Sequence, residues 1–233
     1  MAKIFNSSLV VYSGAGLEPW TESFEFKNRV IDMSENVKLK SLHVQCNANH
    51  DHHAHNHGTI DPHYWLDIKN MIIATNVMTD EFIKIAPQNQ KLYKQNRDSY
   101  IAMLNKLDEK YSNRLKECKK ETIIVNHNAF SYLSKNYGFE VEALSGLSPE
   151  AQPSAKSMVK LIEHVREHNL STIFFESFVS DKAIKSIANE AKVSVDVLQP
   201  LGNITADEAD KKLSYEDIML DNLDKISKAL ECE

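Results

Sequence analysis

Residues 122–130 read Thr122-Ile123-Ile124-Val125-Asn126-His127-Asn128-Ala129-Phe130, an apolar run followed by polar residues. The run is short and rich in β-branched side chains, which predicts a buried strand ending near Asn126. Similar runs, separated by helical patterns, lie at residues 139–144, 172–175 and 194–198. Strands that alternate with helices predict a mostly parallel sheet covered by helices, and therefore an α/β fold.

A second group of elements precedes this sheet. The run at residues 8–12 predicts a strand followed by a turn at Gly14 and Gly16, and residues 38–44 predict a further strand. The glycine pair lacks the third glycine and the GK[ST] sequence of phosphate-binding loops. We therefore interpret it as turn chemistry.

A long helix is predicted between the two groups. Residues 62–120 contain no glycine and only one internal proline, Pro87. The apolar and aromatic residues that recur beyond it at helical spacing are Tyr93, Tyr100, Leu104, Leu107, Tyr111 and Leu115. One helix over residues 88–120 would be about 50 Å long. We expect an N-terminal lobe at residues 1–87, a rigid connecting helix at 88–120 and a C-terminal lobe at 121–233.

Histidines are concentrated in one stretch, the loop at residues 49–58. Five of them fall within eight residues, at His50, His52, His53, His55 and His57. Neutral imidazole is a common zinc ligand and also suits copper, iron and nickel, so this density predicts metal binding. A tag or a low-complexity linker is the alternative. Against it, the tract is internal and other residues interrupt it.

Three further residues are candidates for the site. His63 follows Pro62 at the entry to a helical segment, where its side chain would be held in one orientation. His127 and Glu176 follow two strands of the predicted parallel sheet, and ligands bind beyond the carboxyl ends of such strands. Each also has an ordinary explanation, as a polar surface residue for His63 and as a helix cap or dipole partner for the others.

Composition excludes several classes of protein. The chain has 233 residues and a net charge of -6, with no basic surface that would indicate a nucleic-acid partner. It contains no run of about 18 apolar residues, the length a membrane-spanning helix needs. The N-terminus lacks the apolar core of a secretory signal. Three cysteines, Cys46, Cys118 and Cys232, are too few and too scattered to predict a disulfide framework.

Several motifs occur in an order typical of one family. They are Gly14-Ala15-Gly16-Leu17-Glu18-Pro19-Trp20, the histidine-rich loop, Asp61-Pro62-His63-Tyr64-Trp65-Leu66-Asp67, His127-Asn128-Ala129-Phe130, Leu147-Ser148-Pro149-Glu150-Ala151-Gln152-Pro153-Ser154, Phe175-Glu176 and Leu198-Gln199-Pro200-Leu201-Gly202. In this order they resemble the zinc-binding solute receptors of ABC importers, the ZnuA type, over nearly the whole chain. The resemblance implies two α/β lobes joined by a long rigid helix, with the metal site in the cleft between the lobes.

The resemblance also implies a ligand set. By it, His63 is the metal ligand from the first lobe, His127 is the ligand from the second, and residues 49–58 are the auxiliary loop of zinc receptors. Manganese relatives place a carboxylate where His127 stands and another near Leu201-Gly202-Asn203, where this chain has none. Nitrogen ligands suit zinc and oxygen ligands suit manganese, so Zn²⁺ is the expected ion.

One departure from the family pattern concerns the start of the chain. The family's first histidine ligand lies upstream of the strand at residues 8–12, so we expect this chain to lack that N-terminal part, including the export signal. Two strong ligands remain, and Glu176 or a loop histidine would have to complete the four-coordinate shell of zinc. A fragment, a mis-started reading frame and a receptor that has lost part of its site all fit.

The expected function is reversible metal capture without catalysis. We expect a monomeric receptor that captures zinc in the periplasm or at the cell surface and delivers it to an ABC transporter membrane permease. Three alternatives stay open: a zinc buffer or chaperone acting through the histidine-rich loop, a manganese receptor, and a zinc hydrolase. The hydrolase would need Glu176 as general base, and the sequence contains no HExxH motif to support it.

Overall fold

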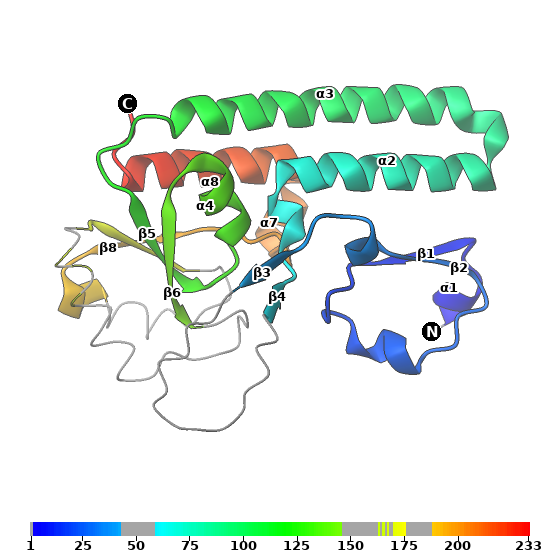
Figure 1. The fold of residues 1–233 in the computed structure, drawn as a ribbon, viewed down its shortest axis with the longest axis horizontal. Coiled ribbons are helices and arrows are strands. Elements are labelled where there is room, and N and C mark those ends of the chain that lie inside the picture. Colours follow the sequence, from blue (N-terminus) through cyan, green and yellow to red (C-terminus); the bar gives the residue numbers. More distant parts are fainter. Residues whose placement is uncertain are drawn as a thin grey trace. The chain divides into compact units, whose positions relative to one another are not determined.

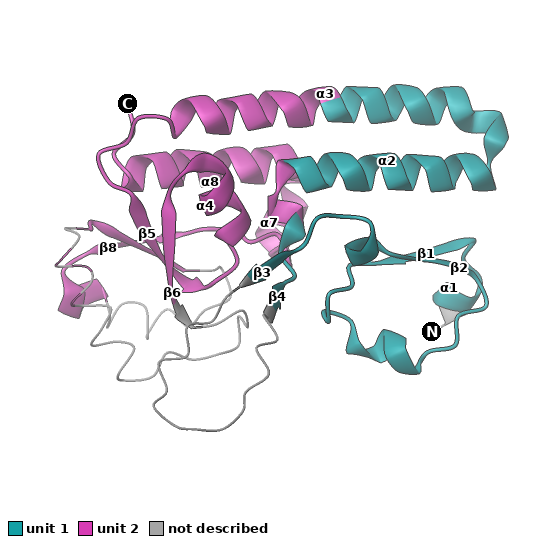
Figure 2. Cartoon of the chain, in the orientation of Figure 1, with its two compact units in different colours: residues 1–64, 69–101 teal, residues 65–68, 102–233 magenta. Residues whose placement is uncertain are grey.

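The computed structural model describes residues 2–42, 59–145, 163, 165, 167, 170–175 and 188–233 (Figure 1). Contacts divide the chain into two compact units, coloured separately in Figure 2. Unit 1 comprises residues 1–64 and 69–101, and unit 2 comprises residues 65–68 and 102–233. The boundary between the units falls inside the long helix, whereas the lobes proposed from the sequence are divided at the ends of that helix.

Unit 2 is built on a four-stranded sheet. Its strands are β5 (Thr122–His127), β6 (Glu140–Ser145), β7 (Thr172–Phe175) and β8 (Ser194–Val197), in the order β6-β5-β7-β8. Every pairing in the sheet is parallel. Each residue of β5 is buried, as expected of a strand whose two faces are both covered. The predicted α/β class and the four predicted strands of this half are confirmed.

The helices of unit 2 that the structure describes in full are α4 (Ser131–Tyr137), α7 (Ala206–Asp210) and α8 (Tyr215–Ala229). A capping box begins α8: the Ser214 hydroxyl accepts from the Asp217 N–H, and the Asp217 carboxylate accepts from the Ser214 N–H at 2.9 Å. The buried residues on the apolar face of α8 include Ile218, Met219, Leu223 and Ile226.

The long helix α3 runs from Gln90 to Arg114 and has 25 residues. At the α-helical rise it is about 37 Å long, shorter than the 88–120 span expected from the sequence. It begins later because Pro87–Asn89 forms a separate 3-10 turn, η4. In unit 2 the Tyr111 side chain is fully buried, and its hydroxyl donates to the main-chain oxygen of Met219 in α8 at 2.6 Å. Within the described part of the chain, no helix is both long and apolar enough to cross a membrane.

Unit 1 contains two small sheets and most of α2. Strands β1 (Leu9–Tyr12) and β2 (Arg29–Asp32) pair in parallel, and β3 (Lys40–Leu42) pairs with β4 (Thr59–Asp61) in the antiparallel sense. Its other elements include α1 (Ala2–Phe5), η1 (Pro19–Ser23), η2 (Met33–Glu35) and α2 (Ile68–Ile85), whereas η3 (Tyr64–Leu66) spans the boundary between the units. The predicted strands at residues 8–12 and 38–44 correspond to β1 and β3.

The glycine pair after β1 forms a tight turn. The Glu18 carboxylate accepts hydrogen bonds from the N–H groups of Ser13 and Gly14, both at 3.0 Å. Gly14 has a φ of 75°, and a Cβ atom there would lie 1.9 Å from the Asp32 Oδ1 atom. Only glycine fits this backbone conformation and this space. The interpretation of the pair as turn chemistry is confirmed.

An ion pair links β2 to α2 within unit 1. The Arg29 guanidinium donates through Nε and Nη2 to the two carboxylate oxygens of Glu81, with Nη2 at 3.0 Å from Oε1. Lys84, one turn further along α2, places its Nζ 2.6 Å from the same Oε1. Hydrogen bonding to Arg29 lowers the pKa of Glu81, while burial acts in the opposite direction and Lys84 reinforces the lowering.

A disulfide joins Cys118 to Cys232 in unit 2, with the two Cα atoms 3.9 Å apart. The chain segments around it pair in the antiparallel sense, and the Lys120 N–H donates to the Leu230 carbonyl at 3.0 Å. The cysteine count led us to expect no disulfide framework, and this expectation was wrong for one pair. The two residues are 114 positions apart, and only the folded chain brings the segment after α3 to the end of α8.

Candidate metal centre

His63 lies at the centre of a tight turn directly after β4. The Pro62 carbonyl accepts a hydrogen bond from the Tyr64 N–H at 2.9 Å, so the chain reverses around His63. The His63 side chain is buried, with 6% of the residue exposed. A buried imidazole in a short turn has little freedom to rotate, and this agrees with the orientation expected from the sequence.

Asp61, the last residue of β4, orients the His63 ring. One carboxylate oxygen, Oδ1, accepts the His63 main-chain N–H at 3.0 Å and lies 2.8 Å from the ring atom Nδ1. Asp61 is fully buried, so its charge acts on the ring at short range with little screening by water. A carboxylate oxygen accepts hydrogen bonds, so Nδ1 carries the N–H that is donated to Asp61. The ring atom that would bind a metal is therefore Nε2.

Sequence reasoning did not identify Asp61 as part of the site. The signal that could have found it is a carboxylate two residues before a candidate histidine ligand, at the end of a short strand. Histidine ligands of metals commonly donate their second N–H to such a carboxylate, which fixes the tautomer and makes the metal-binding nitrogen more basic. The Asp61 and His63 pair therefore has the arrangement that is common among histidine ligands of metals.

His127 is the last residue of β5, at the carboxyl end of the unit 2 sheet. It is buried and lies opposite Ser145 in the register with β6. Its main-chain carbonyl accepts the Ala129 N–H at 2.9 Å, so the strand turns immediately after it. Sequence reasoning predicted this place because ligands bind beyond the carboxyl ends of parallel strands.

The other candidate ligands fall outside the described residues. Glu176 follows the last residue of β7, and the histidines of the loop at residues 49–58 lie between β3 and β4 along the chain. His63 belongs to unit 1 and His127 to unit 2, so each is described within its own unit. Among the residues that the structure describes, no group of three or more histidine, cysteine, aspartate or glutamate side chains is placed to hold a metal ion.

The loop after β8 is held by a hydrogen-bond network within unit 2. Two hydrogen bonds join Gln199, in this loop, to Asn222 of α8. The Gln199 main-chain N–H donates to the Asn222 side-chain oxygen at 2.9 Å, and the Asn222 side-chain amide donates to the Gln199 main-chain carbonyl at 2.8 Å. The Trp65 indole N–H donates to the Pro200 carbonyl at 2.7 Å, and the Tyr215 hydroxyl donates to the Trp65 carbonyl at 2.8 Å. The segment that begins two residues after His63 is thus anchored to this loop.

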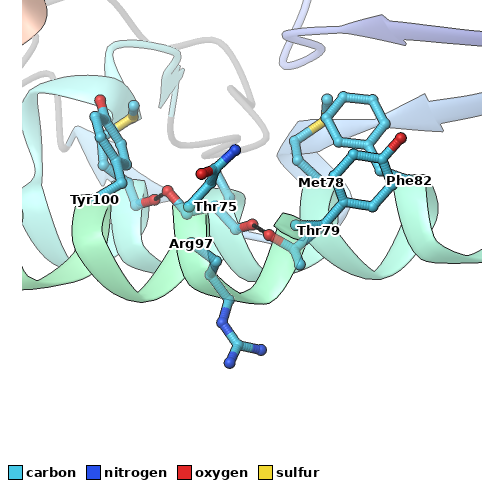
Figure 3. A pocket seen from close by; sticks show the side chains of 10 residues that line it. Thr75, Met78, Thr79, Phe82, Arg97 and Tyr100 are labelled. Atoms are coloured by element: carbon cyan, nitrogen blue, oxygen red, sulfur yellow. Dashed lines mark hydrogen bonds between the residues drawn. The ribbon is translucent and has the colours of Figure 1, made fainter. Parts of the chain in front are cut away.

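A cavity of about 550 Å³ lies in unit 1 between α2 and the first part of α3 (Figure 3). Its walls include Met78, Phe82 and Tyr100, and its lining contains no histidine, cysteine, aspartate or glutamate. The hydroxyls of Thr75 and Thr79 donate to main-chain oxygens of their own helix, as Figure 3 shows for Thr79. The cavity therefore lacks the imidazole, thiolate and carboxylate groups that commonly bind zinc.

The comparisons with known proteins point to one family. The family model described as "Zinc-uptake complex component A periplasmic" matches residues 1–229. The high-affinity zinc uptake system protein ZnuA of Bacillus subtilis (strain 168) is 34% identical over 99% of this chain and 74% of its own length. The zinc-binding lipoprotein AdcA of Streptococcus pneumoniae is 28% identical to this chain. The match covers 100% of this chain and 48% of the length of AdcA.

A solved structure agrees with these relatives. The Zn(II)-bound ZnuA-like domain of Streptococcus pneumoniae AdcA matches 99% of this chain and 82% of its own chain, with a TM-score of 0.80 and 28% identity. The resemblance expected from the ordered motifs is therefore confirmed over nearly the full chain. From the match of its sequence and its fold, this protein belongs to the family of the periplasmic component A of zinc-uptake complexes.

Proposed function

We propose that this chain is the solute-binding component of a zinc importer, which captures Zn²⁺ and delivers it to an ABC transporter membrane permease. The observation that carries the proposal is the buried His63 ring held by the buried carboxylate of Asp61. A buried imidazole whose Nδ1 is bonded to a carboxylate is the arrangement that histidine ligands of metals commonly show. Membership in a zinc-uptake family supports zinc as the ion that His63 would bind.

The donor atoms support zinc over manganese. The two candidate ligands, His63 and His127, offer nitrogen, which zinc accepts readily and manganese binds less well than oxygen. By the resemblance, manganese relatives place a carboxylate after the last strand, near Leu201-Gly202-Asn203, and this chain has none there. Among the residues that the structure describes, a Cβ atom at Gly202 would meet the Trp65 ring, at 3.8 Å.

Zinc needs two further ligands beyond these histidines to reach its usual four-coordinate shell. Glu176 and the histidines of the loop at residues 49–58 are the candidates, together with water. In the proposed mechanism the protein's residues bind and release the ion without changing it chemically, so no enzymatic activity is expected. Acid should weaken binding, because a protonated imidazole cannot act as a ligand. Release at the permease would occur by ligand exchange.

The disulfide supports an exported location. Bonds such as that between Cys118 and Cys232 form and persist in oxidising compartments and are rare where thiols are kept reduced. A receptor in the periplasm or at the cell surface would meet zinc before the permease does. We expect the receptor to act as a monomer, since one chain carries both candidate histidines.

Competitive zinc titration tests the proposal. The wild type should bind one zinc ion tightly, His63→Ala and His127→Ala should each weaken binding by at least an order of magnitude, and His168→Ala, at a histidine outside the proposed ligand set, should not. Deleting residues 49–58 should leave one tight site. If tight binding disappears with the loop and survives both histidine substitutions, the chain is a loop-based zinc buffer and the receptor proposal is wrong.

A further inference from the structure

Asn128, the residue directly after His127, carries a buried oxygen atom that the protein does not satisfy. Within the part of the chain that the structure describes, its side-chain Oδ1 is shielded from solvent and has no hydrogen-bond donor. Buried polar atoms in folded proteins nearly always have a partner, and an exception commonly marks the place of a water molecule, an ion or a functional contact. This exception adjoins one of the two candidate zinc ligands.

The backbone around Asn128 forms a tight turn between buried segments. The Ala129 N–H donates to the His127 carbonyl at 2.9 Å, which places Asn128 at the centre of a three-residue turn. On one side of it the strand β5 is buried throughout, and on the other side Ala129 and Phe130 are buried. The turn therefore places Asn128 directly beside His127, with a side-chain oxygen that is shielded from solvent and lacks a donor.

The chemistry of the amide oxygen decides which partner fits. A carboxamide oxygen is a hard ligand that suits magnesium, calcium or manganese better than zinc, so direct coordination of zinc by Asn128 is disfavoured. A water molecule bound to zinc is different, because the ion polarises its O–H bonds and makes it a strong hydrogen-bond donor. A zinc ion with fewer than four protein ligands carries such water.

We propose that Asn128 is a positioning residue of the zinc site: its Oδ1 accepts a hydrogen bond from a water molecule on the zinc ion held by His127. The inference rests on the proposed zinc site. It gives Asn128 opposite effects in the two states of the protein. In the zinc-free protein the buried oxygen is a cost, and in the loaded protein it holds the water that completes the coordination shell.

Substitutions at Asn128 separate this role from a structural one. Asn128→Leu has a similar shape but no acceptor, so it should lower zinc affinity about tenfold to a hundredfold, the usual range for groups that support a metal ligand. The same change should not lower the stability of the zinc-free protein, because it removes an unsatisfied polar atom. Asn128→Asp keeps an acceptor and should bind zinc at least as tightly as the wild type.

The experiment is a competitive titration with zinc on the full chain, paired with urea unfolding of the zinc-free protein. Asn113→Leu, at an exposed position of α3 in the same unit, is the matched control and should change neither zinc affinity nor its pH dependence. Absorption of the Co²⁺-loaded protein adds a spectroscopic readout, which should change in Asn128→Leu and return in Asn128→Asp. If Asn128→Leu does not fold, Asn128→Ala replaces it with the same expectation.

Two results would overturn the inference. If Asn128→Leu binds zinc as tightly as the wild type, Oδ1 bonds only to water that is not on the zinc ion. If Asn128→Asp loses as much affinity as Asn128→Leu, the shape of the side chain matters and its acceptor oxygen does not. His127→Ala in the same series distinguishes the two levels of the argument. If it weakens binding while Asn128→Leu does not, only the role of Asn128 fails. If neither has an effect, the proposed zinc ligand His127 fails as well.

Discussion

Replacing Asp61 should weaken zinc binding through His63 without touching the metal. Two hydrogen bonds from His63 end on one oxygen of this carboxylate, the main-chain N–H at 3.0 Å and the ring Nδ1 at 2.8 Å. Groups that support a metal ligand in this way contribute about tenfold to a hundredfold in affinity, which corresponds to about 1.4–2.8 kcal/mol. Asp61→Asn keeps an acceptor oxygen and loses the charge, so we expect a loss near the lower end. Asp61→Ala loses both, so we expect the upper end.

The assay is competitive zinc titration near neutral pH against a chelator of known affinity, with urea unfolding of the zinc-free variants alongside. Asp61→Ala should also cost about 1–3 kcal/mol of unfolding free energy, because it leaves a buried N–H without its acceptor. Asp207→Asn, at an exposed position of α7, is the matched control and should leave zinc affinity unchanged. Wild-type affinity in Asp61→Ala would refute the reasoning that this carboxylate prepares His63 for zinc.

Three further predictions concern stability, each read by urea unfolding. Replacing Cys118 and Cys232 by serine removes a link across 114 residues, worth about 4.8 kcal/mol in the chain-entropy account, and a reductant should then destabilise the wild type but not the variant. Tyr111→Phe leaves a main-chain carbonyl of α8 without its buried donor and should cost about 1–3 kcal/mol; no loss would contradict the hydrogen bond. Arg29 lowers the pKa of Glu81 in the folded state, so the ion pair stabilises the protein at pH values above the ordinary glutamate pKa. This stabilisation is lost as the pH falls through the lowered pKa of the folded state. Glu81→Gln should therefore flatten the fall in stability below about pH 4, and an unchanged pH profile would contradict it.

The central sheet could be predicted from local sequence, and several other features could not. The run from Thr122 to Val125 is continuous and β-branched because the strand is buried on both faces, and that requirement is visible in the residues themselves. Strand β4 (Thr59–Asp61) has only three residues and shows no such pattern. The disulfide depends on where α3 and α8 end in space, which neither Cys118 nor Cys232 indicates in its own neighbourhood.

The candidate site shows the same division. His127 could be placed because it follows a predictable strand, and His63 because it belongs to an ordered motif of the family. The carboxylate that orients His63 was missed, since a hydrogen bond between residues two positions apart depends on the turn geometry at Pro62. The buried oxygen of Asn128 was missed because burial of a single atom depends on packing around it, which the residue type does not reveal.

Zinc K-edge X-ray absorption of the protein loaded with less than one equivalent of zinc tests the central claim most directly, because it reports the atoms bound to the ion. The account predicts a shell of nitrogen and oxygen at about 2.0–2.2 Å. Imidazole scattering should fall in both His63→Ala and His127→Ala and stay unchanged in His168→Ala. Wild-type imidazole scattering in both of the first two variants would contradict the assignment of His63 and His127 as the ligands that capture zinc.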